Sequence, residues 1–320
     1  RKGKGAKQRT VIFSKKMLEY IKAYKKGYFK VGDGHQIYYE LCGNPKGKPV
    51  MFVHGGPGGG FSNKDKRFFN QKKFNVTLFD QRGSGRSKPF ASLKGNTTFN
   101  LVEDMRKLLK YLKINKVILF GGSWGSTLSL VYAIRYPETV IGMVLRGIFL
   151  GSEEENDYFV YGVKDHFPEA WERMASLVPE KNRKNIIEYY HSQMKTKDKK
   201  TRKKFTLEWA RYEFSVSKLI YSDKKVKETL KEVKYEAFSL IELHYLKNNC
   251  FLPRDYILKN AGKIKCPVSI VQGRYDLVCS PESAYRLDEK LKNSKLFFTL
   301  AGHSASDEEN EKRLINEINN

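Results

Sequence analysis

Short apolar runs recur at regular intervals along most of the chain and are separated by polar and glycine-rich stretches. Runs of this length, bounded by Gly, Asn, Asp or Pro, are typical of buried β-strands. We predict strands near residues 50–53, 75–79, 116–120, 140–146, 267–272 and 296–300, and helices near 99–113 and 126–136. Strands that alternate with helices favour an α/β fold with a mostly parallel central sheet.

Two segments depart from this alternation. Residues 28–31 and 36–41 flank the turn Gly32-Asp33-Gly34, a pattern that predicts an opening β-hairpin. Residues 151–260 show aromatic-rich helical spacing with few strand signals, and we interpret them as an inserted helical cap. The predicted organisation is a basic N-terminal extension (1–27), the first part of the α/β core (28–150), the helical cap (151–260) and the second part of the core (261–320).

The composition adds a strong basic bias, with a formal net charge of +25 over 320 residues. Basic residues are dense in residues 1–26, which hold ten Lys or Arg and one Glu, and again in residues 195–204. Such runs occur both in solvated lysine-rich loops and in polyanion-binding surfaces. The chain has no helix-turn-helix, zinc-finger or RNP pattern, so no specific nucleic-acid partner is expected. A basic polyanion-binding protein stays as the alternative from a different class.

Cysteine usage and hydropathy indicate the compartment. The four cysteines lack paired metal-ligand spacing, and so few in a chain of this length fit a reducing compartment better than a disulfide scaffold. No apolar run approaches the roughly 20 residues of a membrane span. We therefore expect a cytoplasmic protein. The first residue is not Met, so a removed targeting segment stays open, and the sequence does not give the oligomeric state.

The first chemical signal is Gly121-Gly122-Ser123-Trp124-Gly125, which has the pattern G-x-S-x-G. The motif follows the apolar run 117–120 and precedes a helical segment. A serine on such a sharp strand-to-helix turn projects its hydroxyl out of the sheet, where it can act as a nucleophile. Ser123 is therefore the candidate nucleophile of a serine hydrolase.

A glycine-rich loop supplies a candidate oxyanion hole. The apolar run 50–53 leads into His54-Gly-Gly-Pro-Gly58, where backbone N–H groups can approach a developing negative charge. We predict that the amides of Gly56 and Trp124 form the hole. A flexible loop or a phosphate cradle is the alternative, although a dinucleotide fingerprint is disfavoured because Pro57 has no N–H.

A serine nucleophile needs a base and an orienting carboxylate. Two late apolar runs end in suitable residues: the run 267–272 leads to Asp276, and the run 296–300 leads to His303. The chain order Ser123, Asp276, His303 is that of α/β hydrolases. These three residues are the predicted catalytic triad.

The motifs together resemble those of the proline iminopeptidases (prolyl aminopeptidases) of the α/β-hydrolase superfamily. The matching blocks are His54-Gly-Gly-Pro-Gly58, Asp80-Gln-Arg-Gly-Ser-Gly-Arg-Ser87, Gly121-Gly-Ser-Trp-Gly-Ser126, Leu145-Arg-Gly-Ile-Phe149, Gly273-Arg-Tyr-Asp276 and Gly302-His303. The resemblance implies a serine exopeptidase that releases an N-terminal proline from peptides and needs no metal or cofactor. The expected partner is a peptide with a free N-terminal proline.

The same resemblance implies three substrate-binding residues in or near the predicted cap. Glu213, in Trp209-Ala-Arg-Tyr-Glu213, and Glu242, in the looser match Glu242-Leu-His-Tyr-Leu246, correspond to glutamates that bind the substrate amine. Phe149 corresponds to a wall of the pocket for the prolyl ring, with packing in the core as its alternative role. Asp80, Gln81 and Arg82 are interpreted as braces of the active-site loops.

Alternatives within the hydrolases stay open, because fold alone does not separate them. A broader aminopeptidase, an esterase or an amidase would use the same triad. A zinc aminopeptidase is disfavoured because the chain has no H-E-x-x-H motif.

Overall fold

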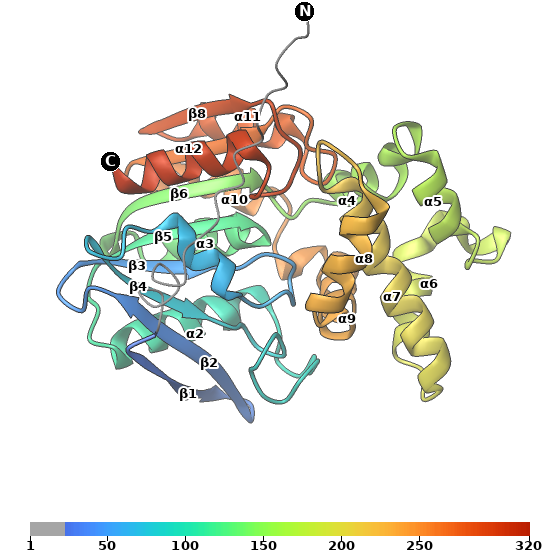
Figure 1. The fold of residues 1–320 in the computed structure, drawn as a ribbon, viewed down its shortest axis with the longest axis horizontal. Coiled ribbons are helices and arrows are strands. Elements are labelled where there is room, and N and C mark those ends of the chain that lie inside the picture. The colour runs from blue at the N-terminus through green and yellow to red at the C-terminus, as the bar shows by residue number, and fades with distance from the viewer. Residues whose placement is uncertain (1–22) are drawn as a thin grey trace, which may run out of the picture.

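The structure is a computed structural model that describes residues 23–320, and its centre is one eight-stranded β-sheet (Figure 1). The strand order is β1-β2-β4-β3-β5-β6-β7-β8. Strands β1 and β2 form the predicted antiparallel hairpin at one edge, β2 is antiparallel to β4, and the other neighbours are parallel. The strands are Lys25–Gly32, His35–Gly43, Lys48–Val53, Phe74–Phe79, Val117–Ser123, Val140–Ile148, Val268–Gly273 and Ser294–Thr299 for β1 to β8.

The α-helices follow the strands as the sequence pattern predicts. They are α2 (Thr98–Tyr111), α3 (Trp124–Arg135), α4 (Glu153–Asp157), α5 (Pro168–Ala175), α6 (Ile186–Met194), α7 (Lys199–Val216), α8 (Asp223–Glu232), α9 (Tyr235–Lys247), α10 (Tyr256–Asn260), α11 (Pro281–Lys290) and α12 (Glu308–Asn319). Two boundaries differ from the prediction. Strand β5 continues to Ser123, so α3 begins two residues earlier than expected, and β1 takes in the end of the predicted extension 1–27. The rest of that extension, residues 1–22, lies outside the described residues.

Alternating side chains on the strands fill two cores, one on each face of the sheet. In β3, Met51 and Val53 face one core, while Val50 and Phe52 face the other. This is the two-residue period of a strand buried on both faces. Helices α2, α3 and α11 contribute buried residues to the first core, and α12 contributes to the second together with the 3₁₀-helix η1 (Asn63–Phe68). The sheet is thus the middle layer of three.

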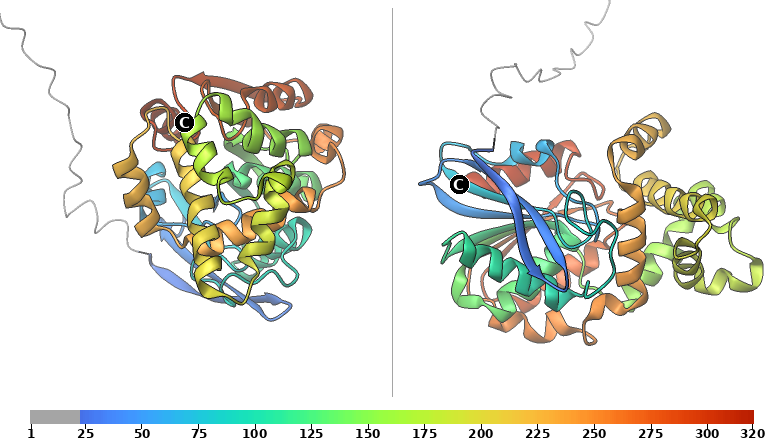
Figure 2. Two further views of the ribbon diagram at one scale, coloured as in Figure 1. Left: turned by 90° about the vertical axis from the view of Figure 1, so that its right-hand side faces the viewer. Right: turned by 90° about the horizontal axis from the view of Figure 1, so that it is seen from below.

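Helices α4–α9, which follow β6 in the chain, lie together beyond one side of the sheet, at the right in Figure 1, and a second view shows the same separation (Figure 2). We call helices α4–α9 the helical insertion. Its interior is aromatic, with Trp209, Tyr190 and Tyr212 all fully buried. Helix α9 contacts the core, because the Tyr245 ring meets the Trp124 indole at 4.6 Å between centroids. The bounds 151–260 for a separate cap domain stay a prediction.

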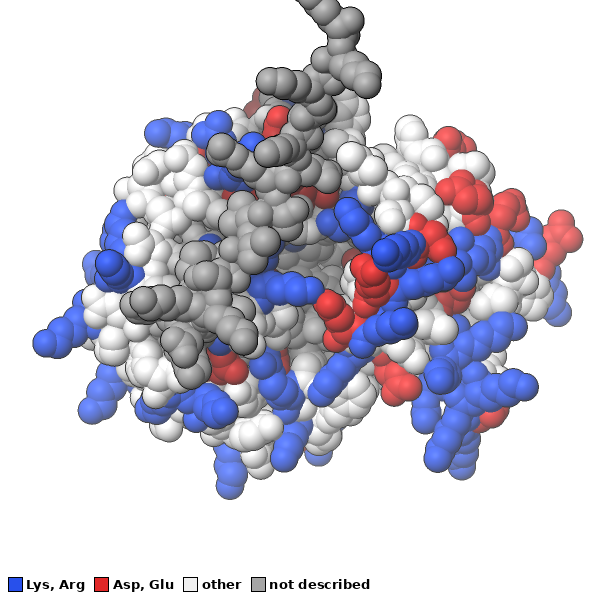
Figure 3. Space-filling view, in the orientation of Figure 1, with Lys and Arg blue, Asp and Glu red and all other residues white. Residues whose placement is uncertain are grey.

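The surface carries the basic bias of the sequence. Lys and Arg side chains are spread over the visible face, and on the helical insertion they alternate with Asp and Glu (Figure 3). Among residues 23–320, no helix is both long and apolar enough to cross a lipid bilayer. All four cysteines are buried free thiols.

Candidate active site

Ser123 lies at the turn between β5 and α3, with a strained backbone at φ 56° and ψ −128°. Positive φ at a residue with a side chain is uncommon and marks a tight, over-determined turn. The turn closes so tightly that a Cβ on Gly121 would meet the Gly125 carbonyl oxygen at 2.4 Å, and a Cβ on Gly125 would meet that of Val53 at 2.1 Å. The glycines of the motif are therefore required by close backbone approach, and they place Ser123 at the carboxyl edge of the sheet.

Asp276 and His303 meet although 27 residues separate them. Nδ1 of His303 donates to the Asp276 carboxylate at 2.9 Å. That carboxylate also accepts from the backbone amides of Val278 at 2.9 Å and Cys279 at 2.8 Å, and from Gln272 Nε2 at 3.1 Å. Four donors fix its position, so the imidazole is held with its proton on Nδ1 and with Nε2 unprotonated.

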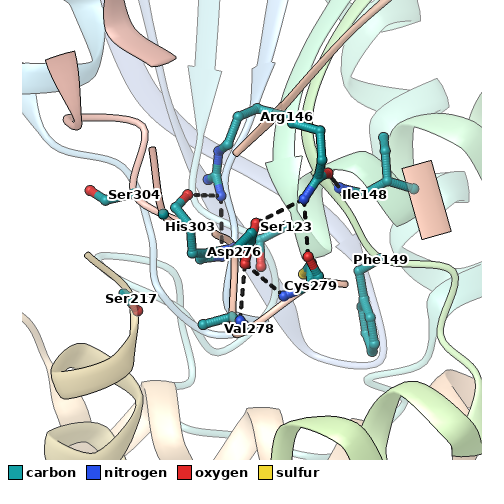
Figure 4. A network of polar contacts seen from close by, with 12 residues as sticks. Ser123, Arg146, Ile148, Phe149, Ser217, Asp276, Val278, Cys279, His303 and Ser304 are labelled. Atoms are coloured by element: carbon teal, nitrogen blue, oxygen red, sulfur yellow. Dashed lines mark hydrogen bonds and ion pairs between the residues drawn. The ribbon is translucent and has the colours of Figure 1, made fainter. Parts of the chain in front are cut away.

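Arg146 is the second group that contacts the imidazole (Figure 4). Its Nη1 lies 3.1 Å from His303 Nε2 and donates to the His303 carbonyl oxygen at 2.6 Å. Among the described residues, the Ser123 hydroxyl makes no hydrogen bond to His303. It lies beside the Cys279 thiol instead. Catalytic hydrogen bonds commonly tighten only in the substrate complex. The structure therefore brings the three predicted residues together in a state where Arg146 occupies the base nitrogen.

Electrostatics favour a neutral imidazole. Burial lowers the pKa of His303, and the charge of Arg146 lowers it further, while the Asp276 carboxylate raises it. The Arg146 guanidinium is itself buried, which lowers its pKa, and its Nε has no hydrogen-bond partner. Gly147 gives these groups room, because a Cβ there would lie 3.0 Å from His303 Cε1 and 3.2 Å from Asp276 Oδ2.

The glycine-rich loop passes directly beside the nucleophile. A Cβ on Gly55 would lie 3.4 Å from Ser123 Cβ, and Gly56 has a φ of +112°, which a side chain would disfavour. Trp124 is the first residue of α3, and the N–H groups of a first helical turn have no acceptor within the helix. The structure thus brings the glycine-rich loop beside Ser123, which Trp124 follows directly, and the amides of Gly56 and Trp124 stay the predicted donors to an oxyanion.

Glu213 on α7 and Glu242 on α9 form a buried pair of carboxyl groups. They hydrogen-bond to each other, and Trp209 Nε1 donates to Glu242 Oε2 at 2.6 Å. Burial raises the pKa of Glu213 to about 7, against the lowering effects of its bond to Glu242 and of the Arg146 charge. Burial and the Glu213 charge raise the pKa of Glu242 well above its ordinary value. Two adjacent buried carboxyls cannot both ionise easily, so the pair holds a proton unless a cation joins it.

Phe149 and Cys279 complete the surroundings of the triad. Phe149 follows β6, and its ring points away from the sheet in Figure 4. It is 8% exposed, and its carbonyl oxygen accepts from Thr127 Oγ1 at 2.6 Å. Cys279 is fully buried, and burial raises the pKa of its thiol well above the ordinary value. A neutral thiol is a poor nucleophile, so Ser123 stays the candidate nucleophile of this site.

Sequence reasoning missed two groups that hold the site, Arg146 and Gln272. Gln272 accepts from the Ile148 amide at 2.9 Å and donates to both Asp276 and the Cys279 carbonyl oxygen, so it links β6 to the carboxylate. Both residues lie within otherwise apolar strands, where an unpaired polar side chain is costly. A polar residue in a buried strand was the available signal. No group of three or more His, Cys, Asp or Glu that could hold a metal ion occurs among the described residues.

Comparison with known proteins places this geometry in a family. Residues 48–310 match the model of the alpha/beta hydrolase fold family. The chain is 41% identical over 294 residues to a proline iminopeptidase of Xylella fastidiosa, with 90% of this chain and 94% of that protein covered. It is 39% identical over 303 residues to a proline iminopeptidase of Arabidopsis thaliana, with 93% of this chain and 80% of that protein covered.

Solved structures support the fold. VinJ superposes with a TM-score of 0.65 at 18% identity, and 93% of this chain and 98% of that chain are covered. The proline iminopeptidase of Mycobacterium smegmatis superposes with a TM-score of 0.61 at 14% identity, covering 92% of this chain and 97% of that chain.

Proposed function

Because the chain belongs to the proline iminopeptidase family of α/β hydrolases, we propose that it releases an N-terminal proline from peptides through a prolyl-enzyme. Ser123 is the nucleophile, His303 the base, and Asp276 the carboxylate that orients the base. The substrate is a peptide with a free N-terminal proline. The observation that carries this proposal is the Glu213–Glu242 pair, which is buried, has raised pKa values and forms no ion pair among residues 23–320.

The chemistry follows from the site. His303 Nε2 takes the Ser123 proton as Oγ attacks the prolyl carbonyl, and Asp276 stabilises the imidazolium. This step requires Arg146 to leave Nε2, from which its Nη1 lies 3.1 Å away. The amides of Gly56 and Trp124 then bind the oxyanion, and His303 gives its proton to the departing peptide amine. Water, activated in turn by His303, hydrolyses the prolyl ester and frees Ser123.

Recognition of the amine explains why the enzyme removes one residue from the end of the peptide. A prolyl ammonium that enters the buried pair displaces the shared proton and leaves two carboxylates around one cation. The nitrogen of an internal or N-blocked proline is a tertiary amide nitrogen, which is uncharged and cannot form an ion pair with the two carboxyl groups. Phe149 supplies an apolar wall for the pyrrolidine ring.

Hydrolysis of matched prolyl arylamides tests the proposal. The free-amine substrate should be cleaved, while its N-acetyl analogue should lose at least about a hundredfold in kcat/KM, because a buried carboxylate pair without a cation costs on the order of a few kcal/mol. Alanyl arylamide is the matched control for the ring, since it keeps the charge. Equal rates on free and blocked substrates would contradict the aminopeptidase assignment and favour an esterase or amidase.

Substitution of the nucleophile separates this enzyme from contaminants. Ser123→Ala should lower turnover by several orders of magnitude without loss of the fold, because the triad acts as a unit. Circular dichroism checks the fold. Activity within tenfold of wild type would remove Ser123 from its proposed role.

A further inference from the structure

We propose that Gln81 is a positioning residue that aims both amides of the oxyanion hole. The inference rests on the proposed function, because it concerns the same site. Gln81 is 1% exposed and follows the end of β4. In the sheet, β3 lies between β4 and β5, so the ends of these three strands carry Gln81, His54 and Ser123 side by side.

The first link runs from Gln81 to the glycine-rich loop. Its backbone N–H donates to His54 Nε2 at 3.0 Å, and its side-chain Nε2 donates to the His54 carbonyl oxygen at 2.9 Å. With Nε2 as an acceptor, neutral His54 carries its proton on Nδ1 and donates to the Gly55 carbonyl oxygen at 2.8 Å, while the Gly60 N–H lies farther from the same nitrogen, at 3.2 Å. Burial lowers the pKa of His54, which keeps this neutral arrangement.

This bond fixes a donor of the oxyanion hole. The Gly55 carbonyl and the Gly56 N–H belong to one planar peptide unit, in which they point in opposite directions. A bond that anchors the carbonyl therefore also sets the direction of the N–H. Gly56 itself has the backbone freedom of a glycine at positive φ, so the direction has to be imposed from outside.

The second link runs from Gln81 to the residue after the nucleophile. Gln81 Oε1 accepts from Trp124 Nε1 at 2.9 Å, with both groups buried. The other side of the indole packs against Tyr245 of the helical insertion. The Gln81 side chain thus links the glycine-rich loop to Trp124. We infer that this link sets the distance between the backbone N–H groups of Gly56 and Trp124. An oxyanion hole stabilises only the tetrahedral state, so loosening it should lower kcat rather than weaken substrate binding.

Two variants break the link from its two ends. Gln81→Met has a similar shape but removes both side-chain bonds, while Trp124→Phe removes the indole donor together with part of a buried ring. Each should lower kcat for prolyl arylamide about tenfold to a hundredfold with KM nearly unchanged. The double variant should lose less than the product of the two single losses, because both changes break the same bond.

Matched controls remove equivalent bonds elsewhere. Trp171→Phe deletes an indole bond to the Val160 carbonyl oxygen on the helical insertion, and Gln71→Met deletes the amide bonds of a glutamine remote from the triad. Both should keep kcat within about twofold. Gln81→Glu is a second variant at the same position: it keeps the acceptor for Trp124 but turns an oxygen towards the His54 carbonyl, and it should lower kcat as well.

The deciding readout is the affinity for a free-amine proline boronate, which forms a tetrahedral adduct with the serine, compared with that for proline, which does not. In Gln81→Met the boronate should bind about tenfold to a hundredfold more weakly while proline inhibition stays the same. Folded Gln81→Met with kcat within twofold of wild type, or with proline affinity lost in equal measure, would overturn the proposal.

Burst kinetics with a p-nitrophenyl ester give the same comparison independently of proline recognition. If the wild type cleaves the ester but no prolyl substrate, the proposed function fails, while the ester rates still decide the role of Gln81.

Discussion

At the scale of single residues, the acidic pair determines how the site responds to pH. Glu213 and Glu242 are both buried, and the pair gains a full second charge only when a cation enters. His303 works differently, because its pKa is lowered and its neutral form is the base of the proposed mechanism. Binding of the amine and proton transfer by the triad therefore respond to pH over separate ranges.

The first prediction concerns pH profiles. As the pH falls through about 7, Glu213 takes up a proton and the pair loses its remaining negative charge, so the kcat/KM for prolyl arylamide should decline through a rise in KM. A neutral p-nitrophenyl ester does not need the pair, so its profile should decline only at the lower pKa of His303. Coincident acid limbs for the two substrates would show that one group controls both.

The second prediction concerns stability. The pKa of Glu213 is raised to about 7 in the folded protein, above its value of about 4.3 in an unfolded chain, so between these values the folded state holds a proton that the unfolded state lacks. This contribution to stability is present at low pH and is lost as the pH rises towards 7. Glu213→Gln should therefore raise the unfolding free energy at pH 8 by about 1 kcal/mol or more and flatten its decline from pH 5 to 8, while kcat/KM falls at least tenfold. Denaturant titrations at the two pH values measure the change, and an unchanged pH slope would contradict it.

At the scale of elements, the turn from β5 into α3 combines catalysis with chain packing. The two flanking glycines let the turn pack against the end of β3, near the Val53 carbonyl oxygen. The proposed nucleophile therefore lies against the glycine-rich loop that follows β3. This part could be predicted from the sequence, because G-x-S-x-G after an apolar run has a defined geometry. The order of the strands in the sheet and the long-range side-chain contacts could not be predicted from the sequence. The approach of Arg146 to His303 joins residues 157 apart in sequence, and it depends on a β6 bulge and a rotamer that no local pattern encodes.

The glycine requirement gives the third prediction. Gly125→Ala places a methyl group 2.1 Å from the Val53 carbonyl oxygen, which is backbone and cannot turn aside. We expect a loss of more than about 2 kcal/mol in unfolding free energy together with a loss of activity. Gly262→Ala is the control, since a Cβ there meets nothing within 4 Å. Thermal unfolding and arylamide turnover measure both effects, and a Gly125→Ala protein as stable as the control would refute the argument.

At the scale of the whole molecule, the chain has a net charge of +25, and the Lys and Arg side chains of the face in Figure 3 are spread over it rather than gathered in one patch. Residues 1–22 carry eight Lys or Arg and one Glu, and the sheet begins only at Lys25. Each triad residue, each oxyanion donor and each acidic partner lies within residues 54–303.

The fourth prediction concerns this leading segment. Removal of residues 1–22 should leave kcat and KM for prolyl arylamide within about twofold of the full chain, because the chemistry lies elsewhere. The cut has to precede β1, where Lys25 and Lys26 pair with Leu41 and Glu40. Solubility at low salt should change, since about +7 of charge is lost. A large fall in kcat with an intact fold would show that the segment contributes to the site.

The position of the helical insertion between β6 and β7 divides the enzyme's two tasks between separate stretches of chain. The proposed nucleophile, base and orienting carboxylate come from the sheet and its loops, whereas both proposed amine-binding carboxyls come from α7 and α9. Under the proposed function, the demand for a free terminus is therefore a property that one exchangeable stretch of chain confers on a general acyl-transfer scaffold. A chimera that keeps this sheet but takes an insertion without the acidic pair should hydrolyse esters and blocked amides, having lost its exopeptidase character in a single genetic step.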